Sequence, residues 1–341
     1  MLECALIFTT QFCVGAFVTH TLDSVTPPES SAFVLTSEAC EEALVELSTL
    51  QDLLRWGISR MHEAGLYFGH GTDNARDDAL MLATHALHLP WDIDNEWQTS
   101  RLTRSERQAV IELFARRINE RMPTPYLTGE AWFYGLPFNV DERVLIPRSP
   151  IAEIIAARFQ PWLGNKSVHR ILDLCTGSGC IGIACAMEFP QAHVELLDIS
   201  FDALALADEN IARHQLGDRV MALQSDLFDA ADGKYDIIVS NPPYVDADDM
   251  SCLPEEFHNE PVLALAAGAD GLDLVRIMLA QARQYLSDDG IFIVEVGNSW
   301  PALEEAYPMV PFMWQEFEMG GHGVFVLTAD QLDECAEALK L

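Results

Sequence analysis

The second half of the chain alternates between short apolar segments and amphipathic segments, and this alternation limits the possible folds more than any other feature. Segments with the composition of buried strands lie at 169–175, 193–199, 219–226, 235–241, 290–297 and 323–329. Helical periodicity occupies the intervals at 180–189, 201–215 and 271–286. The alternation predicts an α/β fold with a doubly wound, mainly parallel sheet. A longer, non-helical connection before the last segment predicts that the final strand is antiparallel.

The first part of the chain has a helical pattern instead. Residues 37–65, 72–89 and 103–122 carry apolar side chains at helical spacing. Candidate N-caps are Thr72 or Asp73 for the second helix and Thr103 or Ser105 for the third. Proline, glycine and alternating aromatic residues then predict a β-hairpin linker. The predicted parts are a poorly structured extension (1–36), a helical domain (37–124), the linker (125–149), the α/β domain (150–330) and a C-terminal tail (331–341).

The charge of the chain is strongly negative and unevenly distributed. Acidic residues outnumber basic ones by 53 to 20, for a formal net charge of −33. Residues 171–341 hold 31 acids and 6 bases, a net of −25. A surface of this sign repels phosphates and attracts basic partners, so we expect no stable binding to DNA. An adaptation for solubility would explain the charge equally well, and both explanations can hold.

The cysteine pattern and the N-terminal residues indicate the cellular compartment in which the protein works. The eight cysteines form no CxxC pair and no disulfide framework, and we expect no metal site, because Cys175, Cys180 and Cys185 lack a suitably placed histidine. This pattern predicts a reducing cytoplasm. Residues 2–18 are apolar but contain Glu3 and Gln11 without a basic region, so they resemble neither a signal peptide nor a membrane span.

A glycine-rich turn follows the first strand-like segment. The stretch from Asp173 to Gly179 reads Asp-Leu-Cys-Thr-Gly-Ser-Gly and leads into a predicted helix. Glycines allow backbone N–H groups to approach a ligand, and the N-terminus of a helix favours negative charge. Many α/β folds have such a turn for packing alone, so the turn by itself does not decide between a ligand and packing.

Acidic residues end the next two predicted strands. Asp198 follows the glycines by about 20 residues, the position from which one carboxylate accepts both hydroxyls of a ribose. With the turn, it predicts a cofactor that contains a nucleoside, while a helix cap is the alternative. Asp226 and the backbone of Leu227 end the third strand at the same edge, where an adenine ring could be recognised. A role as a turn or helix cap is equally compatible with Asp226.

The fourth predicted strand ends in Asn241-Pro242-Pro243-Tyr244. Doubly wound folds bind ligands at the switch point of the sheet, where this tetrapeptide should lie. The side-chain oxygen of Asn241 and the carbonyl of Pro242 are two acceptors on a stiff turn, and such a pair suits an –NH₂ group. Tyr244 can stack on a flat amide or base. The tetrapeptide alone leaves a nucleobase and a glutamine side chain equally possible as acceptor.

Together, these motifs resemble the S-adenosylmethionine-dependent amino-methyltransferases. The segments 55–80, 126–138, 253–272 and 317–328 narrow the resemblance to the protein-glutamine N5-methyltransferase family, and to the branch acting on large-subunit ribosomal protein L-three. The resemblance spans about residues 50–330. It departs at Ser149-Pro150-Ile151 after Arg148, where members acting on release factors usually have a Pro-Arg-Pro-acid sequence. It implies a Rossmann-like class I methyltransferase fold with a seven-stranded sheet, and a helical domain that recognises the substrate.

The resemblance also assigns roles to individual residues. The residues implied to line S-adenosylmethionine are Asp173, Cys175, Thr176, Gly177, Ser178, Gly179, Asp198, Asp226, Leu227 and Asn241. The glutamine is implied to be held by Asn241, Pro242, Pro243 and Tyr244, with Asn241, Pro242 and Tyr244 as the catalytic set. Relatives often have an aromatic residue at the position of Leu227 and a glycine at that of Cys175.

The implied partner is therefore a basic ribosomal protein, free or on an assembling particle, in the cytoplasm and without a membrane. Methylation of a release-factor glutamine, or of adenine N6 or guanine N2 in a nucleic acid, is the alternative activity. The acidic catalytic half argues against a nucleic acid. A non-catalytic assembly factor that binds the cofactor structurally is a third alternative, and the intact Asn241 and Tyr244 argue against it.

Overall fold

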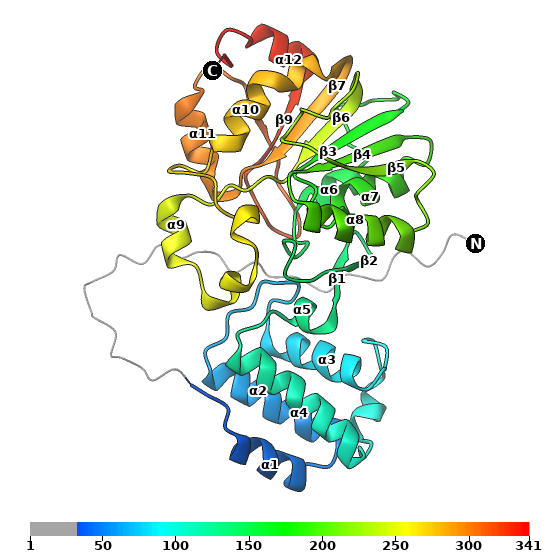
Figure 1. The fold of residues 1–341 in the computed structure, drawn as a ribbon, viewed down its shortest axis with the longest axis vertical. Coiled ribbons are helices and arrows are strands. Elements are labelled where there is room, and N and C mark those ends of the chain that lie inside the picture. Colours follow the sequence, from blue (N-terminus) through cyan, green and yellow to red (C-terminus); the bar gives the residue numbers. More distant parts are fainter. Residues whose placement is uncertain (1–32, 341) are drawn as a thin grey trace.

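The computed structural model describes residues 33–340, in which a group of helices is joined through a β-hairpin to a sheet covered by helices on both faces (Figure 1). Residues 1–32 of the predicted extension lie outside the described residues. At residues 33–36 the chain packs on the helices: Leu35 is buried, and its N–H and C=O both bond to the side chain of Asn119. The predicted extension is therefore too long by these few residues.

The helical part follows the predicted pattern with two differences. Its elements are α1 (Ser37–Glu46), α2 (Leu50–Glu63), α3 (Ala75–Ala86), η1 (Asn95–Thr99), α4 (Arg104–Asn119) and α5 (Thr124–Thr128). The single helix expected over 37–65 is split, because Thr49 and Asp52 form a capping box that starts α2. Asn74 caps α3, because the hydroxyl of Thr72 donates to Asp78 instead. Thr103 caps α4, as predicted.

The predicted hairpin links the two parts. Strands β1 (Glu130–Phe133) and β2 (Leu136–Asn139) pair antiparallel around Tyr134-Gly135. Both turn residues have positive φ, 55° and 70°, as expected for the tight turn whose twist matches the strands. The buried side chain of Asn210 accepts from the Asn139 N–H and donates to the Ser178 carbonyl, so the hairpin is fixed beside the glycine turn.

The predicted α/β class with a seven-stranded, mainly parallel sheet is confirmed. The strand order is β5-β4-β3-β6-β7-β9-β8. The strands are β3 (Arg170–Leu174), β4 (His193–Asp198), β5 (Val220–Gln224), β6 (Tyr235–Ser240), β7 (Leu286–Glu295), β8 (Met313–Trp314) and β9 (Val324–Thr328). As predicted, the final strand β9 runs antiparallel to β7. The two-residue strand β8 was not predicted, because so short an edge strand has no periodic pattern.

Helices cover both faces of the sheet (Figure 1). They are α6 (Ile151–Ala156), α7 (Cys180–Glu188), α8 (Phe201–Arg213), α10 (Asp273–Gln281), α11 (Trp300–Ala306) and α12 (Ala329–Glu334), with short η4 (Ala282–Gln284) before β7 and η5 (Gly297–Ser299) before α11. The remaining helices, α9 (Ala247–Cys252), η2 (Glu255–Asn259) and η3 (Val262–Ala264), belong to the loop after Tyr244. Neighbouring strand residues enter opposite cores: Ile171 packs with α6 and α7, and Leu172 packs with α10. Burial on both faces explains the continuous apolar strands.

Two predictions about the C-terminal region were wrong. The connection expected to be non-helical contains α11, whose Leu303 is buried against the sheet. The segment 331–341 was set apart as a tail, whereas α12 extends into it and buries Leu332, and Leu339 is buried beyond the helix. Both helices are short and lie in acidic segments, so their few apolar contacts were not visible in the sequence pattern.

A third glycine holds α7 close to the sheet. The spacing of Gly177, Gly179 and Gly182 is that of a G-x-G-x-x-G motif, in which the last glycine allows close packing of helix and strand. A Cβ atom added to Gly182 would lie 2.1 Å from Leu196 Cδ2 and 3.0 Å from Asp173 Oδ2. The position of the glycine turn therefore depends on the absence of a side chain at Gly182.

We expect G182A to destabilise the protein, although alanine is normally favoured over glycine inside a helix by about 1 kcal/mol. The added methyl group must displace Leu196 or the helix, and such overpacking costs about 1–3 kcal/mol. Urea unfolding would measure the change. G217A is the matched control, because nothing lies within 4 Å of its Cβ position. Equal or greater stability of G182A would contradict the close packing.

Candidate functional site

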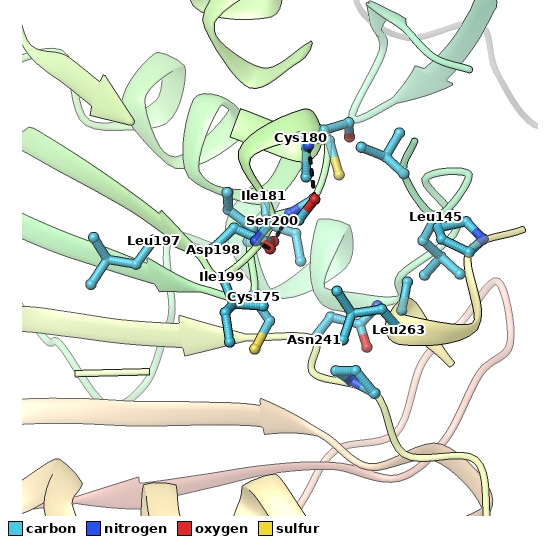
Figure 2. Close-up of a pocket in the computed structure, with 18 of the residues that line it drawn as sticks. Leu145, Cys175, Cys180, Ile181, Leu197, Asp198, Ile199, Ser200, Asn241 and Leu263 are labelled. Carbon is cyan, nitrogen blue, oxygen red and sulfur yellow. Dashed lines mark hydrogen bonds between the residues drawn. The ribbon is translucent and has the colours of Figure 1, made fainter. Parts of the chain in front are cut away.

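A pocket opens at the carboxyl ends of the central strands, where β3 and β6 lie side by side and the chain leaves them in opposite directions (Figure 2). The turn after β3, the end of β4, the turn after β5 and Asn241 form one wall. Residues of the linker and of the loop after Tyr244 form the other wall. They are Arg143, Val144, Leu145, Pro147, Arg148, Ser149, Pro261, Leu263 and Ala264.

Most of the predicted site residues meet at this pocket. Those that line it are Cys175, Thr176, Gly177, Ser178, Asp198, Asp226, Leu227, Asn241 and Pro243. Figure 2 shows Cys175, Asp198 and Asn241, from three different strand ends, around the same opening. The other four, which are Asp173, Gly179, Pro242 and Tyr244, are not among the lining residues.

Asp173 lies in the wall behind the pocket. It is fully buried, and its Oδ2 atom accepts from the Thr176 hydroxyl at 2.6 Å and from the Gly182 N–H at 2.9 Å. Burial raises the pKa of Asp173 to about 7, although both hydrogen bonds act in the opposite direction. Asp173 thus connects both ends of the glycine turn and shapes it from behind.

Asp198 faces the pocket from the end of β4. Its Oδ2 accepts from the Gly177 N–H and its Oδ1 from the Ser200 N–H, both at 2.9 Å (Figure 2). Burial raises its pKa, and the backbone bonds partly offset that effect. Each carboxylate oxygen keeps a further lone pair, so the side chain can accept two more hydrogen bonds from a ligand.

Two lining residues have left-handed backbone conformations that cost energy for residues other than glycine. The φ angles are +55° at Cys175 and +46° at Leu227. The Ser225 hydroxyl fixes the second turn by donating to the Leu227 carbonyl at 2.7 Å and accepting from the Ala230 N–H at 2.9 Å. Strain of this kind clusters at ligand sites. Burial raises the pKa of Cys175, so its thiol stays protonated and is no nucleophile.

The side chain of Asn241 has an unused acceptor. Its Oδ1 atom is buried in the described structure without any hydrogen-bond partner. The preceding residue, Ser240, donates its hydroxyl to the Leu174 carbonyl at 2.7 Å, which joins the ends of β6 and β3. Pro242 and Pro243 are both buried. An unsatisfied buried oxygen on so rigid a turn is costly, and a ligand with an N–H donor would remove that cost.

Tyr244 ends the tetrapeptide and is held at its hydroxyl. The hydroxyl donates to Glu295 Oε1 at 3.0 Å, and burial raises the pKa of Tyr244. The side chain is therefore a neutral phenol with a fixed ring orientation.

Sequence reasoning missed a buried ion pair that closes the pocket. Glu260, in the loop after Tyr244, accepts from Arg148 at 2.6 and 2.8 Å and from the Ile146 N–H at 3.0 Å. His70 of the helical part lies 3.4 Å from the same carboxylate. Burial alone would raise the pKa of Glu260, but Arg148 and His70 together outweigh burial and hold that pKa at about 2. The sequence held no local signal for this pair, since 112 positions separate Arg148 and Glu260.

The same loop is attached to the helical part by a second buried carboxylate. Glu256 accepts from the Tyr67 N–H at 3.0 Å and pairs with Arg121 at 3.3 Å and Arg117 at 3.6 Å. Figure 1 shows this loop, in yellow, between the sheet and the helices. The helical domain thus holds the loop whose residues Pro261, Leu263 and Ala264 line the pocket.

The arginines in and near helix α4 form ion pairs within the protein, and those of Arg104 and Arg116 lie at the surface. The neighbourhood of α4 contains the ion pairs Arg104–Glu41, Arg116–Glu120, Arg117–Asp78 and Arg121–Glu256. Within residues 33–340, no helix is long and apolar enough to cross a bilayer. The same residues contain no group of three or more histidine, cysteine or acidic side chains placed to hold a metal ion.

Comparisons with known proteins identify the family of this chain. Residues 157–270 match the family described as methyltransferase small domain. The ribosomal protein uL3 glutamine methyltransferase of Xanthomonas campestris pv. campestris is 53% identical over 288 residues, 84% of this chain and 93% of the relative. The protein of the same name from Francisella tularensis subsp. tularensis is 49% identical over 302 residues, 88% of this chain and 96% of the relative. The chain therefore belongs to the ribosomal protein uL3 glutamine methyltransferases, the family predicted from its motifs.

Proposed function

We propose that this protein transfers a methyl group from S-adenosylmethionine to the side-chain amide nitrogen of a glutamine in ribosomal protein uL3. The observation that carries the proposal is the buried, unpartnered Oδ1 atom of Asn241 at the switch point of the sheet. Family membership supports the glutamine rather than a nucleobase as acceptor, because both relatives are named for that reaction.

The residues present fit S-adenosylmethionine. A Cβ atom added to Gly177 would meet no atom within 4 Å, so the turn borders open space that a ligand can fill. The free lone pairs of Asp198 suit a ribose diol, and the strained turn at Asp226 and Leu227 lies where the adenine would be recognised. The start of α7 favours the amino-acid carboxylate. When bound, S-adenosylmethionine supplies a methyl carbon that is activated by the positive charge of its sulfonium.

Asn241 and Pro242 would hold the acceptor amide. The –NH₂ group of a glutamine has two hydrogens, and the Asn241 Oδ1 atom and the Pro242 carbonyl accept one each. Accepting both hydrogens fixes the plane of the amide and aims the electron density above nitrogen at the methyl carbon. Tyr244 and Pro243 complete the site, with the tyrosine ring against the flat face of the amide.

Orientation supplies most of the acceleration. An amide nitrogen is a weak nucleophile, because its lone pair is shared with the carbonyl. Holding it in line with an activated methyl group converts an improbable encounter into a unimolecular step, and the two acceptors stabilise the positive charge that develops on nitrogen. The methylated nitrogen is then strongly acidic and loses its proton to water, so no side chain has to act as general base.

The charge distribution supports a basic protein as substrate. The α/β part carries the net charge of −25 counted over residues 171–341. Arg104, Arg116 and Arg117 of α4 are paired with carboxylates of the protein itself. A ribosomal protein met free or on an assembling particle, in the cytoplasm, fits this surface better than exposed RNA.

N241A tests the clamp. Loss of the side-chain acceptor should lower kcat by about 10²–10³-fold, the cost of removing one preorganised group at a reaction centre. Binding of S-adenosylmethionine should remain measurable by calorimetry. The matched control is N165A, in an exposed turn before β3 at the opposite end of the sheet. Near wild-type turnover by N241A would contradict the role of the clamp.

D198A tests the cofactor site. Removing a carboxylate that accepts two charge-assisted hydrogen bonds should weaken S-adenosylmethionine binding by about 10–100-fold. Turnover at saturating cofactor should fall less. D208A, on an exposed position of α8, serves as the control for loss of one negative charge. If D198A and D208A bind the cofactor equally well, Asp198 does not contact it.

The acceptor can be identified with labelled S-adenosylmethionine. Purified uL3, large-subunit precursor particles, a peptide-chain release factor and naked ribosomal RNA should be compared at equal concentration. We expect label in uL3, free or in particles, and localised by mass spectrometry to one glutamine side chain. Label in RNA without label in protein would refute the proposal, and label in the release factor alone would favour that alternative.

A further inference from the structure

We propose that Glu295, with the residues that follow it up to Ser299, is the positioning element that sets the orientation of Tyr244. Glu295 ends β7, the strand next to β6, so it reaches Tyr244 from the neighbouring strand. The inference rests on the proposed function, since it takes Tyr244 to contact the acceptor glutamine. It adds a residue for which neither the motifs nor the resemblance provided a role.

This segment contacts Tyr244 at three places. The Glu295 carboxylate accepts the phenol hydroxyl at 3.0 Å. The ring lies against Gly297, where an added Cβ atom would be 2.4 Å from Cε2 of Tyr244, and the φ angle of +44° also favours glycine. The Ser299 hydroxyl donates to the main-chain carbonyl of Tyr244 at 2.8 Å. The tip, the face and the backbone of the tyrosine are therefore all held by one short segment.

Glu295 is itself held by the wall of the pocket. Its second carboxylate oxygen accepts from the Ser149 hydroxyl at 2.5 Å, and Ser149 is one of the residues that line the pocket. The carboxylate thus connects Tyr244, on the acceptor side, to the linker that closes the opposite wall.

The burial of this carboxylate is difficult to explain by stability alone. Glu295 is 5% exposed, and the preceding residues of β7, Ile291 to Val294, are fully apolar and buried. A carboxylate in such a core costs free energy that an apolar side chain would not. Its two hydroxyl donors make it tolerable, and both donors belong to segments that form the site. We infer that its benefit is a fixed ring orientation for the acceptor.

E295A and E295Q separate the positioning role from a merely structural one. In E295A, the phenol loses its acceptor and the ring can tilt, so kcat/KM for the protein acceptor should fall about 10–100-fold, mainly through KM. The affinity for S-adenosylmethionine should stay within about threefold, because the residue does not line that part of the pocket. E295Q should recover most of the loss, since Tyr244 can still donate to Oε1 and the glutamine amide can donate to Ser149.

A second tyrosine–carboxylate pair in the same sheet provides a matched control. The Tyr235 hydroxyl donates to Glu195 Oε2 at 2.6 Å, near the amino ends of β6 and β4 and away from the pocket. E195A should lower the melting temperature without changing kcat/KM for the acceptor. If E295A behaves like E195A, with reduced stability and unchanged kinetics, Glu295 has only a structural role.

A double-mutant cycle with Y244F completes the test. If Glu295 acts through the phenol hydroxyl, the losses in kcat/KM caused by E295A and Y244F should be non-additive, whereas additive losses would contradict the proposal. S299A removes only the bond to the Tyr244 carbonyl and provides a second test if E295A folds poorly. It should raise KM for the protein acceptor. An unchanged KM would contradict the positioning role of this segment. Absence of glutamine methylation by the wild-type protein would instead refute the proposed function itself.

Discussion

The parallel pairing of β3 with β6 at the centre of the sheet determines where chemistry can occur in this protein. From β3 the chain continues through β4 and β5 toward one edge, and from β6 it continues to β7 on the other side. The loops leaving the two strands therefore separate and leave an opening between them. The hydroxyl of Ser240 bonds to the carbonyl of Leu174, so the ends that carry Asn241 and Cys175 keep a constant separation.

Three buried carboxylates hold the walls of this opening. Asp173 supports the glycine turn from behind. Glu260 joins the loop after Tyr244 to the linker, and Glu295 joins Tyr244 to the linker. Each is expensive to bury, and Glu260 and Glu295 have partners from distant parts of the chain. Arg148 and His70 make Glu260 the point at which the helical domain meets the pocket. Through His70, the helical domain therefore contacts the loop that borders the pocket.

Strong local patterns made the fold predictable. Apolar strands, amphipathic helices and the paired prolines identified the sheet, its order of elements and the strand that ends in Asn241. Thr49 and Asn74 show where prediction of helix starts fails. Several side chains near a helix start can act as the N-cap, and the folded structure decides which one accepts from the backbone N–H. The helix over 329–334 was missed for a related reason: its stability comes from docking Leu332 on the sheet rather than from periodicity.

The sequence by itself determined the chemical groups of the site: a glycine turn, acids after strands, and an asparagine on a rigid turn. Tertiary structure decided how each group is used. It placed Asp173 in the wall rather than at the opening, left the Asn241 oxygen without a partner, and brought Glu295 to Tyr244 across 51 positions. Local preferences act over a few residues, whereas the partners of a buried polar group are known only once distant segments have packed together.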